Sequence, residues 1–532
     1  MKKISSTSPI AFFCAEYALQ SDLPTYAGGL GVLAGDMLLE ASKENIDFLL
    51  VSLRYGAVDV TKNGYKKVTN KKGEPLVLSI PIADKKIFFS AWMVSFGTAK
   101  ILLIDPDVAE NSAEDRILCA ELYDSHFYTR ISQQMLLGLG GTAILAVLDI
   151  NPSIYHLNEG HTGITAMGII VREMKNGADF ERAVTAAREK TIATKHTILS
   201  TAGTYIPSGE FKKIFGGICD EHKIQLMDMY NLGKFELDHD MFSTTKFLLA
   251  MSIRHNAVSR LHMEKERQIH PKSDLTYITN GVSVGRWQAK VFSESLKDGT
   301  PERLWAAKNQ MREELVSFVK TKTGKTLDPD ICTIVWARRL AAYKQPELLF
   351  SDINRLKKIC ASRKVQFIFA GKAHKADEWA QKVAQKLQSI SEDPFFLGRI
   401  VYIPDYNLDI ADILVAGADV WLNTPERGNE ACGTSGMKAG LNAAVMCSTS
   451  DGWMDEVDWQ GIGWTLPEEN TANAIYDVIE KEIIPAFYAR TLKRIPESWM
   501  NHIRATMNIV SLKYSAKRML NEYIEKMYRL KN

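Results

Sequence analysis

The chain has 532 residues, a formal net charge of +2, 46% hydrophobic residues and 24% charged residues. These values are typical of a globular protein with roughly two to four domains, and they lack the basic excess that marks a general nucleic-acid binder. The seven cysteines form no CxxC pair, and no apolar run reaches the length of a membrane span. We therefore predict a reduced, cytoplasmic protein with buried thiols, and neither nucleic acid nor a membrane as a partner.

Short apolar runs alternate with longer amphipathic stretches along the first half of the chain. The apolar runs predict strands at 9–14, 47–53, 75–82, 86–95, 100–105, 153–157, 191–195 and 275–279. The amphipathic stretches predict helices at 115–148 and 162–175.

The alternation becomes more regular in the second half. Strands are predicted at 331–337, 365–370, 399–403 and 418–423, and helices at 345–361, 376–390, 408–416 and from about 435. Strands that alternate with helices indicate an α/β fold with parallel, doubly wound sheets, in which ligands bind at the carboxyl ends of the strands. A domain junction is predicted within 281–330, and apolar residues at near-helical spacing predict a packing helix within 501–532.

Three glycines, Gly28, Gly29 and Gly31, follow the first predicted strand and open a helix. Glycines there let backbone N–H groups approach an anion at the positive end of the helix. The same residues, with Ala34, also match the spacing of a dinucleotide-binding fingerprint, although no acidic residue follows at the expected distance. A similar group at 138–140 lies inside a predicted helix, where close helix packing is the better interpretation.

Three cations, Arg338, Arg339 and Lys344, come directly after the predicted strand 331–337. They stand where a parallel sheet binds its ligands, and arginine and lysine suit phosphate. The alternative is a solvated helix start. Cations at a helix N-terminus oppose the helix dipole, which favours a ligand.

The stretch from Glu430 to Lys438 has a Gly/Thr/Ser-rich turn that enters a helix. Such a turn binds phosphate through backbone N–H and hydroxyl groups, and a partly desolvated lysine can form a Schiff base with an aldehyde. The alternative is an ordinary surface lysine. The GxxxxGK[ST] pattern is absent, which excludes a P-loop.

His156, Glu159 and His161 invite a metal hypothesis, but their spacing matches neither HExxH nor HxxEH, and no metal is predicted. They are better interpreted as a polar wall of a site. His196 follows another predicted strand and has the same interpretation, with a structural histidine as the alternative. The acidic loop 451–458 is assigned capping or hydrogen-bonding roles in preference to a glycosidase carboxylate pair.

Several segments, taken in order, resemble the glycogen/starch/α-glucan (maltodextrin) phosphorylase family, in particular its short bacterial and archaeal members. They are CAEYALQSDLPTYAGGLGVLAGD, YHLNEGH, KHT, ITNGV, WARRLAAYK, FAGKAHKADE, DYNLDIADILVAGADVWLNTP and EACGTSGMKAGLN. The last is similar to the family's cofactor-lysine motif and is the most specific of them.

The resemblance implies a GT-B-like fold, with two doubly wound Rossmann-like domains facing across a cleft. We expect residues 1–285 to form a glucan- and phosphate-site domain and 286–500 a pyridoxal-phosphate domain. Residues 501–532 are expected to form a helix that packs back on the N-terminal domain. A homodimer is the oligomer that the family suggests.

The resemblance also implies a function: retaining phosphorolysis of α-1,4-glucans by inorganic phosphate, which releases α-D-glucose 1-phosphate. Pyridoxal 5′-phosphate is the implied cofactor and acts through its own phosphate. The residues implied to hold the cofactor are Lys438, Gly433, Thr434, Ser435, Arg338 and Tyr406. Those implied to hold the substrate phosphate are Gly29, Arg339 and Lys344, and Gly28 is implied to bind substrate. Those implied to contact the sugar are Asn280, Glu430, Cys432, His161 and, near the scissile bond, His196.

The sequence departs from the common family pattern at a few positions. Cys432 stands where serine is frequent, Ala443 where glycine is frequent and Ser283 where histidine is frequent, and the segment 198–211 is unusual. Two alternatives stay open, a nucleotide-sugar-dependent GT-B glucan synthase and a non-catalytic glucan-binding protein. Lys438 argues against the first, and Arg339, Lys344 and Lys438 together argue against the second.

Overall fold

The computed structural model describes residues 8–198, 203–235, 240–269, 274–373, 377–489 and 495–529. Its contacts divide the chain into two compact units. Unit 1 comprises Met1–Val258, Met263–Ile278 and Leu520–Asn532, and unit 2 comprises Ser259–His262 and Thr279–Met519. All seven cysteines are free and buried, which confirms the prediction of buried thiols. Within the described ranges, no helix has the length and apolar character needed to cross a membrane.

Unit 1 is built on one mostly parallel sheet, with strand order β12-β11-β8-β7-β1-β2-β6-β5-β3 and with β4 beside β5. The parallel strands are β1 (Ile10–Phe13), β2 (Phe48–Leu53), β6 (Ala99–Asp105), β7 (Ile154–Asn158), β8 (Thr191–Thr194), β11 (Arg254–Ala257) and β12 (Leu275–Tyr277). The antiparallel edge consists of β3 (Lys66–Lys67), β4 (Leu78–Ile82) and β5 (Lys85–Phe96). A short pair, β9 (Tyr205–Pro207) and β10 (Met241–Ser243), stands apart from this sheet.

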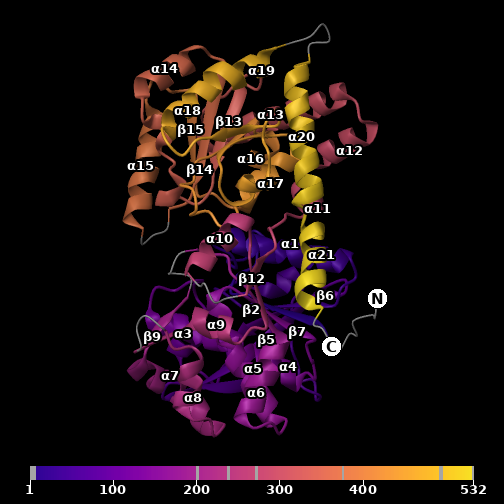
Figure 1. Ribbon diagram of the computed structural model, residues 1–532, viewed down its shortest axis with the longest axis vertical. Coiled ribbons are helices and arrows are strands. Elements are labelled where there is room, and N and C mark those ends of the chain that lie inside the picture. Colours follow the sequence, from indigo (N-terminus) through magenta and orange to yellow (C-terminus); the bar gives the residue numbers. More distant parts are fainter. Residues whose placement is uncertain are drawn as a thin grey trace. The chain divides into compact units, whose positions relative to one another are not determined.

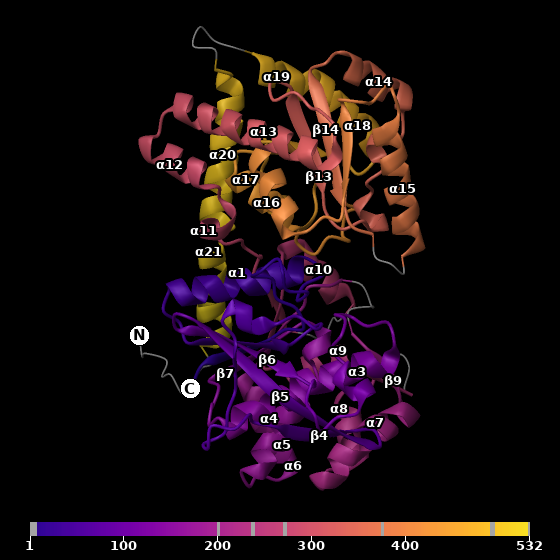
Figure 2. The same ribbon diagram turned by 180° about the vertical axis from the view of Figure 1, so that it is seen from behind.

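Helices cover both faces of this sheet. Helix α1 (Gly29–Lys43) lies on one face, and α4 (Gly141–Val147), α5 (Thr165–Lys175) and α6 (Phe180–Lys190) lie on the other (Figure 2). Further helical segments of this part of the chain are α2 (Ala113–Arg116), α3 (Phe127–Met135), the π-helix η2 (Leu136–Gly140), α7 (Ser208–Glu221), α8 (Leu226–Leu232), α9 (Thr244–Ala250), α10 (Arg260–Ile269) and the short 3-10 helices η1 (Val60–Asn63) and η3 (Gly160–Thr162). A Cβ on Gly138 would lie 2.6 Å from the Thr165 nitrogen, so the predicted close helix packing at 138–140 is confirmed.

Unit 2 is built on six parallel strands in the order β15-β14-β13-β16-β17-β18. They are β13 (Cys332–Ala337), β14 (Val365–Gly371), β15 (Ile400–Pro404), β16 (Val420–Asn423), β17 (Val445–Thr449) and β18 (Trp464–Leu466). Helices α14 (Ile353–Ala361) and α15 (Glu378–Glu392) cover one face, and α13 (Pro301–Thr323), α16 (Leu408–Gly417) and α17 (Thr434–Leu441) cover the other (Figures 1 and 2). The other helices are α11 (Val284–Trp287), α12 (Lys290–Asp298), α18 (Thr471–Val478), α19 (Ile484–Tyr488) and α20 (Glu497–Lys513).

The C-terminal segment is helical, as predicted. Helix α21 (Ala516–Tyr523) and the π-helix η9 (Ile524–Tyr528) follow α20. In unit 1 the hydroxyl of Tyr528 lies 2.9 Å from Nδ1 of His156, and the hydroxyl of Tyr523 bonds to Thr194 and Asn256. The chain passes from unit 1 to unit 2 between residues 278 and 279 and returns to unit 1 between 519 and 520. The predicted domain boundaries lay at 285/286 and 500/501. The predicted domain organisation, including the cleft, stays a proposal.

Two predicted helices are shorter than expected. The helix predicted at 115–148 is interrupted, because Tyr123 has a left-handed backbone (φ 59°) and regular helix resumes only at Phe127. The helix predicted at 345–361 begins at Ile353. Gln345 precedes a proline, which disfavours helical backbone, and the Asp352 carboxylate caps the observed helix by accepting two backbone N–H bonds.

The strand orders identify where each unit would bind a ligand. From β1 the chain moves outward through β2 and β6 and then returns to β7 on the opposite side of β1, so the strand order of unit 1 reverses between β1 and β7. In unit 2 the order reverses between β13 and β16 for the same reason. Crevices at the carboxyl ends of strands beside such a switch point are the usual ligand sites of open α/β sheets.

Candidate active site

The switch point of unit 2 brings together two loops that carry predicted site residues. The loop after β13 holds Arg338 to Lys344, and the loop after β16 leads to Glu430 and α17. Thr424 joins the two loops, since its hydroxyl donates to the Lys344 carbonyl at 2.9 Å. The neighbouring positions of β13 and β16 therefore place residues that are distant in sequence on one edge of the sheet.

Arg338, Lys344 and Glu430 form a buried ionic cluster at this edge. The Glu430 carboxylate lies 2.6 Å from the Lys344 ammonium and 3.0 Å from the Arg338 guanidinium. Burial alone would raise the pKa of Glu430, but Arg338 and Lys344 outweigh it and lower that pKa to about 2. Burial and the nearby Arg338 lower the pKa of Lys344 to about 8. The cluster thus holds two cations around one internal carboxylate.

Helix α17 begins at this cluster. Its N-cap, Gly433, has a left-handed backbone (φ 83°) and no side chain caps the helix. A Cβ at Gly433 would lie 3.3 Å from the Glu430 side chain and 3.7 Å from the Arg338 guanidinium. Glycine therefore lets the chain enter α17 close to Glu430 and Arg338, and a helix start without a side-chain cap beside a cation suits an anion.

Several buried polar atoms around this helix start have no hydrogen-bond partner among the described residues. They are Nε and Nη1 of Arg338, Oγ of Ser435 and Oδ1 of Asn280. Buried polar groups are normally paired, so donors without a partner among the described residues, grouped at an uncapped helix N-terminus, suit an anion. A phosphate group matches the donors of Arg338, Ser435 and the first turn of α17.

Lys438 is buried one turn into α17. Its ammonium lies 3.8 Å from the ring centroid of Trp287, over the face of the indole. Ala443, just past the helix, has a left-handed backbone (φ 63°), which explains physically why glycine is frequent there in the family pattern. The prediction of a partly desolvated lysine at this helix start is confirmed.

Two further contacts complete the unit 2 site. The backbone N–H of Asn280 donates to the Cys432 thiol, which is buried. Asp451 accepts the Glu430 N–H at 2.9 Å and the Gly452 N–H at 2.8 Å, and burial raises the pKa of Asp451 to about 6. The predicted hydrogen-bonding role for the acidic loop is confirmed, because Asp451 positions the backbone of Glu430.

In unit 1, the carboxylate of Glu16 organises the glycine loop after β1. One oxygen accepts the N–H groups of Ala27 and Gly28 at 2.8 and 3.1 Å, and the other accepts the Tyr123 hydroxyl at 2.8 Å. Helix α1 starts at Gly29 with no side-chain cap, so the predicted helix opening is confirmed. The N–H groups of Ala27 and Gly28 serve Glu16, which leaves the first turn of α1 as the part of the loop suited to an anion.

The predicted histidines of unit 1 have defined partners. His161 accepts the Ala15 N–H through Nε2 at 3.0 Å, and burial lowers its pKa to about 3, so it is neutral. The ring nitrogen Nε2 of His196 lies 2.7 Å from Asn158 Oδ1, and the backbone N–H of His196 donates to the Glu159 carboxylate at 2.9 Å. His156 lies instead in the core, where both ring nitrogens have partners, so His156 and His161 do not share a metal site.

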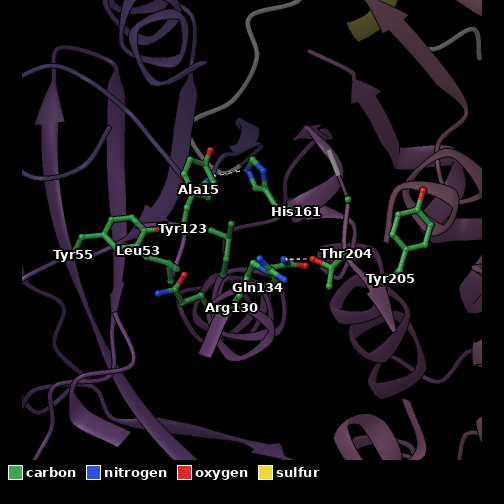
Figure 3. Close-up of a pocket in the computed structure, with 12 residues that line it drawn as sticks. Ala15, Leu53, Tyr55, Tyr123, Arg130, Gln134, His161, Thr204 and Tyr205 are labelled. Carbon is green, nitrogen blue, oxygen red and sulfur yellow. Dashed lines mark hydrogen bonds between the residues drawn. The ribbon is translucent and has the colours of Figure 1, made fainter. Parts of the chain in front are cut away.

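A cavity of about 590 Å³ adjoins His161 in unit 1 (Figure 3). Its polar residues include Arg130, Gln134, Thr204, Tyr55 and Tyr123, and Gln134 donates to Thr204 at 2.8 Å. Aromatic rings beside guanidinium and amide groups suit a neutral polyhydroxyl ligand. Part of the unusual segment 198–211 lines this cavity, although 199–202 lie outside the described residues.

The structure separates the predicted site residues into two groups. Unit 2 contains Arg338, Arg339, Lys344, Tyr406, Glu430, Cys432, Gly433, Thr434, Ser435, Lys438 and Asn280, and unit 1 contains Gly28, Gly29, His161 and His196. Arg339 is exposed and donates to the Tyr343 hydroxyl. Tyr406 lies half-buried between β15 and α16.

Sequence reasoning missed several residues at these sites. Trp287, which lies under Lys438, belongs to no motif identified in the sequence. Glu16, Asn158 and Tyr123 were also missed. A buried acid directly after a strand was the one signal that would have identified Glu16.

Comparison with known proteins agrees with this geometry. The carbohydrate phosphorylase family model matches residues 288–460, which include the cations after β13 and helix α17. The chain is 32% identical to maltodextrin phosphorylase of Thermococcus litoralis, over 98% of this chain and 70% of that protein. The chain belongs to the carbohydrate phosphorylase family. This phosphorylase-family chain is also 31% identical to glycogen phosphorylase of Aquifex aeolicus, over 98% of this chain and 86% of that protein.

A further relative of this phosphorylase-family chain matches nearly the whole of it. It is an uncharacterized protein of Methanocaldococcus jannaschii, 30% identical over 98% of this chain and 100% of that protein. The resemblance stated from the motifs is therefore confirmed over nearly the whole sequence.

Proposed function

We propose that this phosphorylase-family chain catalyses retaining phosphorolysis of α-1,4-glucans, with release of α-D-glucose 1-phosphate. The observation that carries the proposal is the uncapped start of α17, where Arg338 and Ser435 present donors that have no partner in the described part of the chain, one turn from Lys438. The names of the relatives from Thermococcus litoralis and Aquifex aeolicus support glucan phosphorolysis as the activity.

Pyridoxal 5′-phosphate is the proposed cofactor, and the residues present fit it. Lys438 would carry it, and Gly433, Thr434, Ser435 and Arg338 would hold its phosphate, with Tyr406 also assigned to the cofactor. When bound, its phosphate supplies a proton donor and acceptor beside the substrate phosphate. The indole of Trp287 offers a flat apolar surface beside Lys438, which suits an aromatic ring.

Arg339 and Lys344 are proposed to hold the substrate phosphate. Two phosphates that lie close together repel each other, so a site that holds both needs cations and helix dipoles around them. Glu430 offsets part of the positive charge of Arg338 and Lys344. We propose that phosphate draws Lys344 away from Glu430, which frees that carboxylate to accept a sugar hydroxyl.

Sugar contacts are proposed for residues of each unit. Asn280 has a buried Oδ1 with no partner among the described residues, and its backbone N–H donates to Cys432, two residues after Glu430. In unit 1, His161 and His196 are proposed to contact the glucan, with Gly29 assigned to the substrate phosphate and Gly28 to substrate binding. Neutral His161 suits hydrogen bonding to hydroxyl groups rather than charge pairing.

Replacement of Gly433 by alanine should weaken cofactor binding. A residue with a Cβ in the left-handed region costs about 1–2 kcal/mol, and this Cβ would also press on the Glu430 side chain. The matched control is Gly461→Ala, which has the same backbone strain (φ 72°) but an added Cβ that meets open space. Titration with pyridoxal phosphate should show weaker binding for Gly433→Ala alone, and equal binding by both variants would contradict the assignment.

Phosphate binding should weaken in alkaline solution. Lys344 is charged below its pKa of about 8 and loses its charge above it, so the KM for phosphate should rise as the pH passes 8. Lys344→Arg keeps its charge throughout this range and should lack the rise. Initial rates from pH 6.5 to 9.5 measure this effect, and a rise of equal size in Lys344→Arg would assign it to another group.

The proposed function is tested by incubating the cofactor-loaded protein with maltoheptaose and inorganic phosphate. We expect glucose 1-phosphate to appear as phosphate is consumed. Elongation of maltoheptaose from UDP-glucose or ADP-glucose without phosphate would instead favour a synthase. Glucan binding without turnover in either assay would favour a non-catalytic protein.

A further inference from the structure

The C-terminal end of helix α17 is closed by one fully buried side chain, that of Asn442. Its amide nitrogen donates to the backbone carbonyl of Lys438 at 2.8 Å and to that of Trp287 at 2.7 Å. Its amide oxygen accepts the Ala289 N–H at 2.8 Å. One amide thus connects the backbone of Lys438 to the backbone of the tryptophan over which the Lys438 ammonium lies.

Asn442 is itself held by a buried lysine of α13. Lys308 is fully buried, and its ammonium donates to the carbonyl of Asn442 at 3.2 Å, to that of Ala416 at 3.1 Å and to that of Ala418. An ammonium has three N–H donors and no acceptor, so three carbonyls satisfy it completely. A cation is also favourable where α16 and α17 end, because helix C-termini carry partial negative charge.

We propose that Asn442 and Lys308 are positioning residues for Lys438, which fix its backbone against Trp287 so that its side chain meets the cofactor in one geometry. The inference rests on the proposed function, because it takes Lys438 as the cofactor lysine. Neither residue contacts the anion-binding start of α17, and both act through the backbone at its other end.

The chemistry of each contact makes the arrangement specific to these side chains. Aspartate at position 442 would turn an oxygen toward the carbonyls of Lys438 and Trp287, which repel it. Methionine at position 308 would fill a similar volume but leave three buried carbonyls without donors. Breaking such contacts leaves unsatisfied buried groups, which loosens α17 without removing any group that touches a ligand.

The test compares Lys308→Met, Lys308→Arg and Asn442→Asp with a matched control, Lys325→Met. Lys325 donates to the Ser391 carbonyl at 2.7 Å near the end of α15, so its loss also removes a lysine from a helix C-terminus in unit 2. Hydrogen–deuterium exchange of residues 434–442 is measured without cofactor. The affinity for pyridoxal phosphate and the absorption maximum of the bound cofactor are measured by titration.

We expect Lys308→Met and Asn442→Asp to speed exchange at 434–442 about tenfold, to weaken cofactor affinity about tenfold and to shift the absorption maximum. Lys308→Arg should recover part of each effect, because it keeps the charge and the donors. Lys325→Met should leave all three readouts close to wild type. Lys308→Met and Asn442→Asp that behave like Lys325→Met would overturn the proposal.

The two proposals fail separately. If the wild type does not bind pyridoxal phosphate, the proposed function is wrong, whereas faster exchange at 434–442 in the variants would still support Asn442 and Lys308 as the residues that fix α17. If Lys308→Met does not fold, the positioning role is tested with Lys308→Arg and Asn442→Asp, since both keep a polar group at the site. Unchanged exchange in those two variants would overturn the positioning role.

Discussion

Replacement of Lys438 by arginine should abolish most phosphorolysis. Arginine keeps a cation over Trp287 but cannot link to an aldehyde, so the cofactor would lose its anchor. Loss of a positioned electrostatic group in an active site typically lowers kcat by about 10²–10³-fold, and we expect kcat/KM to fall at least that far. Initial rates of glucose 1-phosphate release with excess pyridoxal phosphate measure the effect.

The control for this variant is Lys386→Arg, an exposed lysine of unit 2 that pairs with Glu347. It should retain wild-type rates, which shows that a lysine-to-arginine change in this unit is harmless in itself. Lys438→Arg that binds pyridoxal phosphate tightly and turns over at the wild-type rate would exclude Lys438 as the cofactor residue.

The second large effect is expected at Arg339. Arg339→Lys keeps the charge but loses the guanidinium, which can bind phosphate through two N–H groups at once. Hydrogen bonds to a charged group contribute about 1.5–3 kcal/mol. The KM for phosphate should therefore rise about 10- to 150-fold, with cofactor content unchanged. Arg339 is exposed, so the change should leave the free energy of unfolding nearly unaffected.

Arg427→Lys is the matched control for this prediction. Arg427 lies after β16 with 39% of its side chain exposed, and it pairs with Asp455 and Glu468 rather than with the ionic cluster. Its phosphate kinetics should match the wild type. A rise in the KM for maltoheptaose in Arg339→Lys, with the KM for phosphate unchanged, would move Arg339 from the phosphate site to the sugar site.

Much of the fold could be predicted because the local signals are strong. The runs at 331–337 and 365–370 are continuous and apolar, as buried parallel strands are, and they correspond to β13 and β14. The helix starts at Gly29 and near 435 also followed from glycine and small polar residues that lead into amphipathic stretches. The interruptions at Tyr123 and Gln345 were harder to predict, because a left-handed backbone on a residue with a Cβ is set by its surroundings.

The sequence predicted which residues belong to the proposed site but not which of them contact one another. Arg338, Lys344 and Lys438 were assigned to phosphate and cofactor from their positions after strands and in motifs. The ion pairs of Glu430 with Arg338 and Lys344 could not be predicted, because they depend on β13 and β16 being neighbours in the sheet. Trp287 was missed because its contact with Lys438 joins two helices, α11 and α17, that are distant in the sequence.

The most direct test of the account is to locate the cofactor on the chain. The protein is loaded with pyridoxal phosphate, reduced with borohydride, digested and mapped by mass spectrometry. We predict a single pyridoxyl group on Lys438, and its loss in Lys438→Arg. A pyridoxyl group on a different lysine, or no label on protein prepared with ample cofactor, would contradict the central claim.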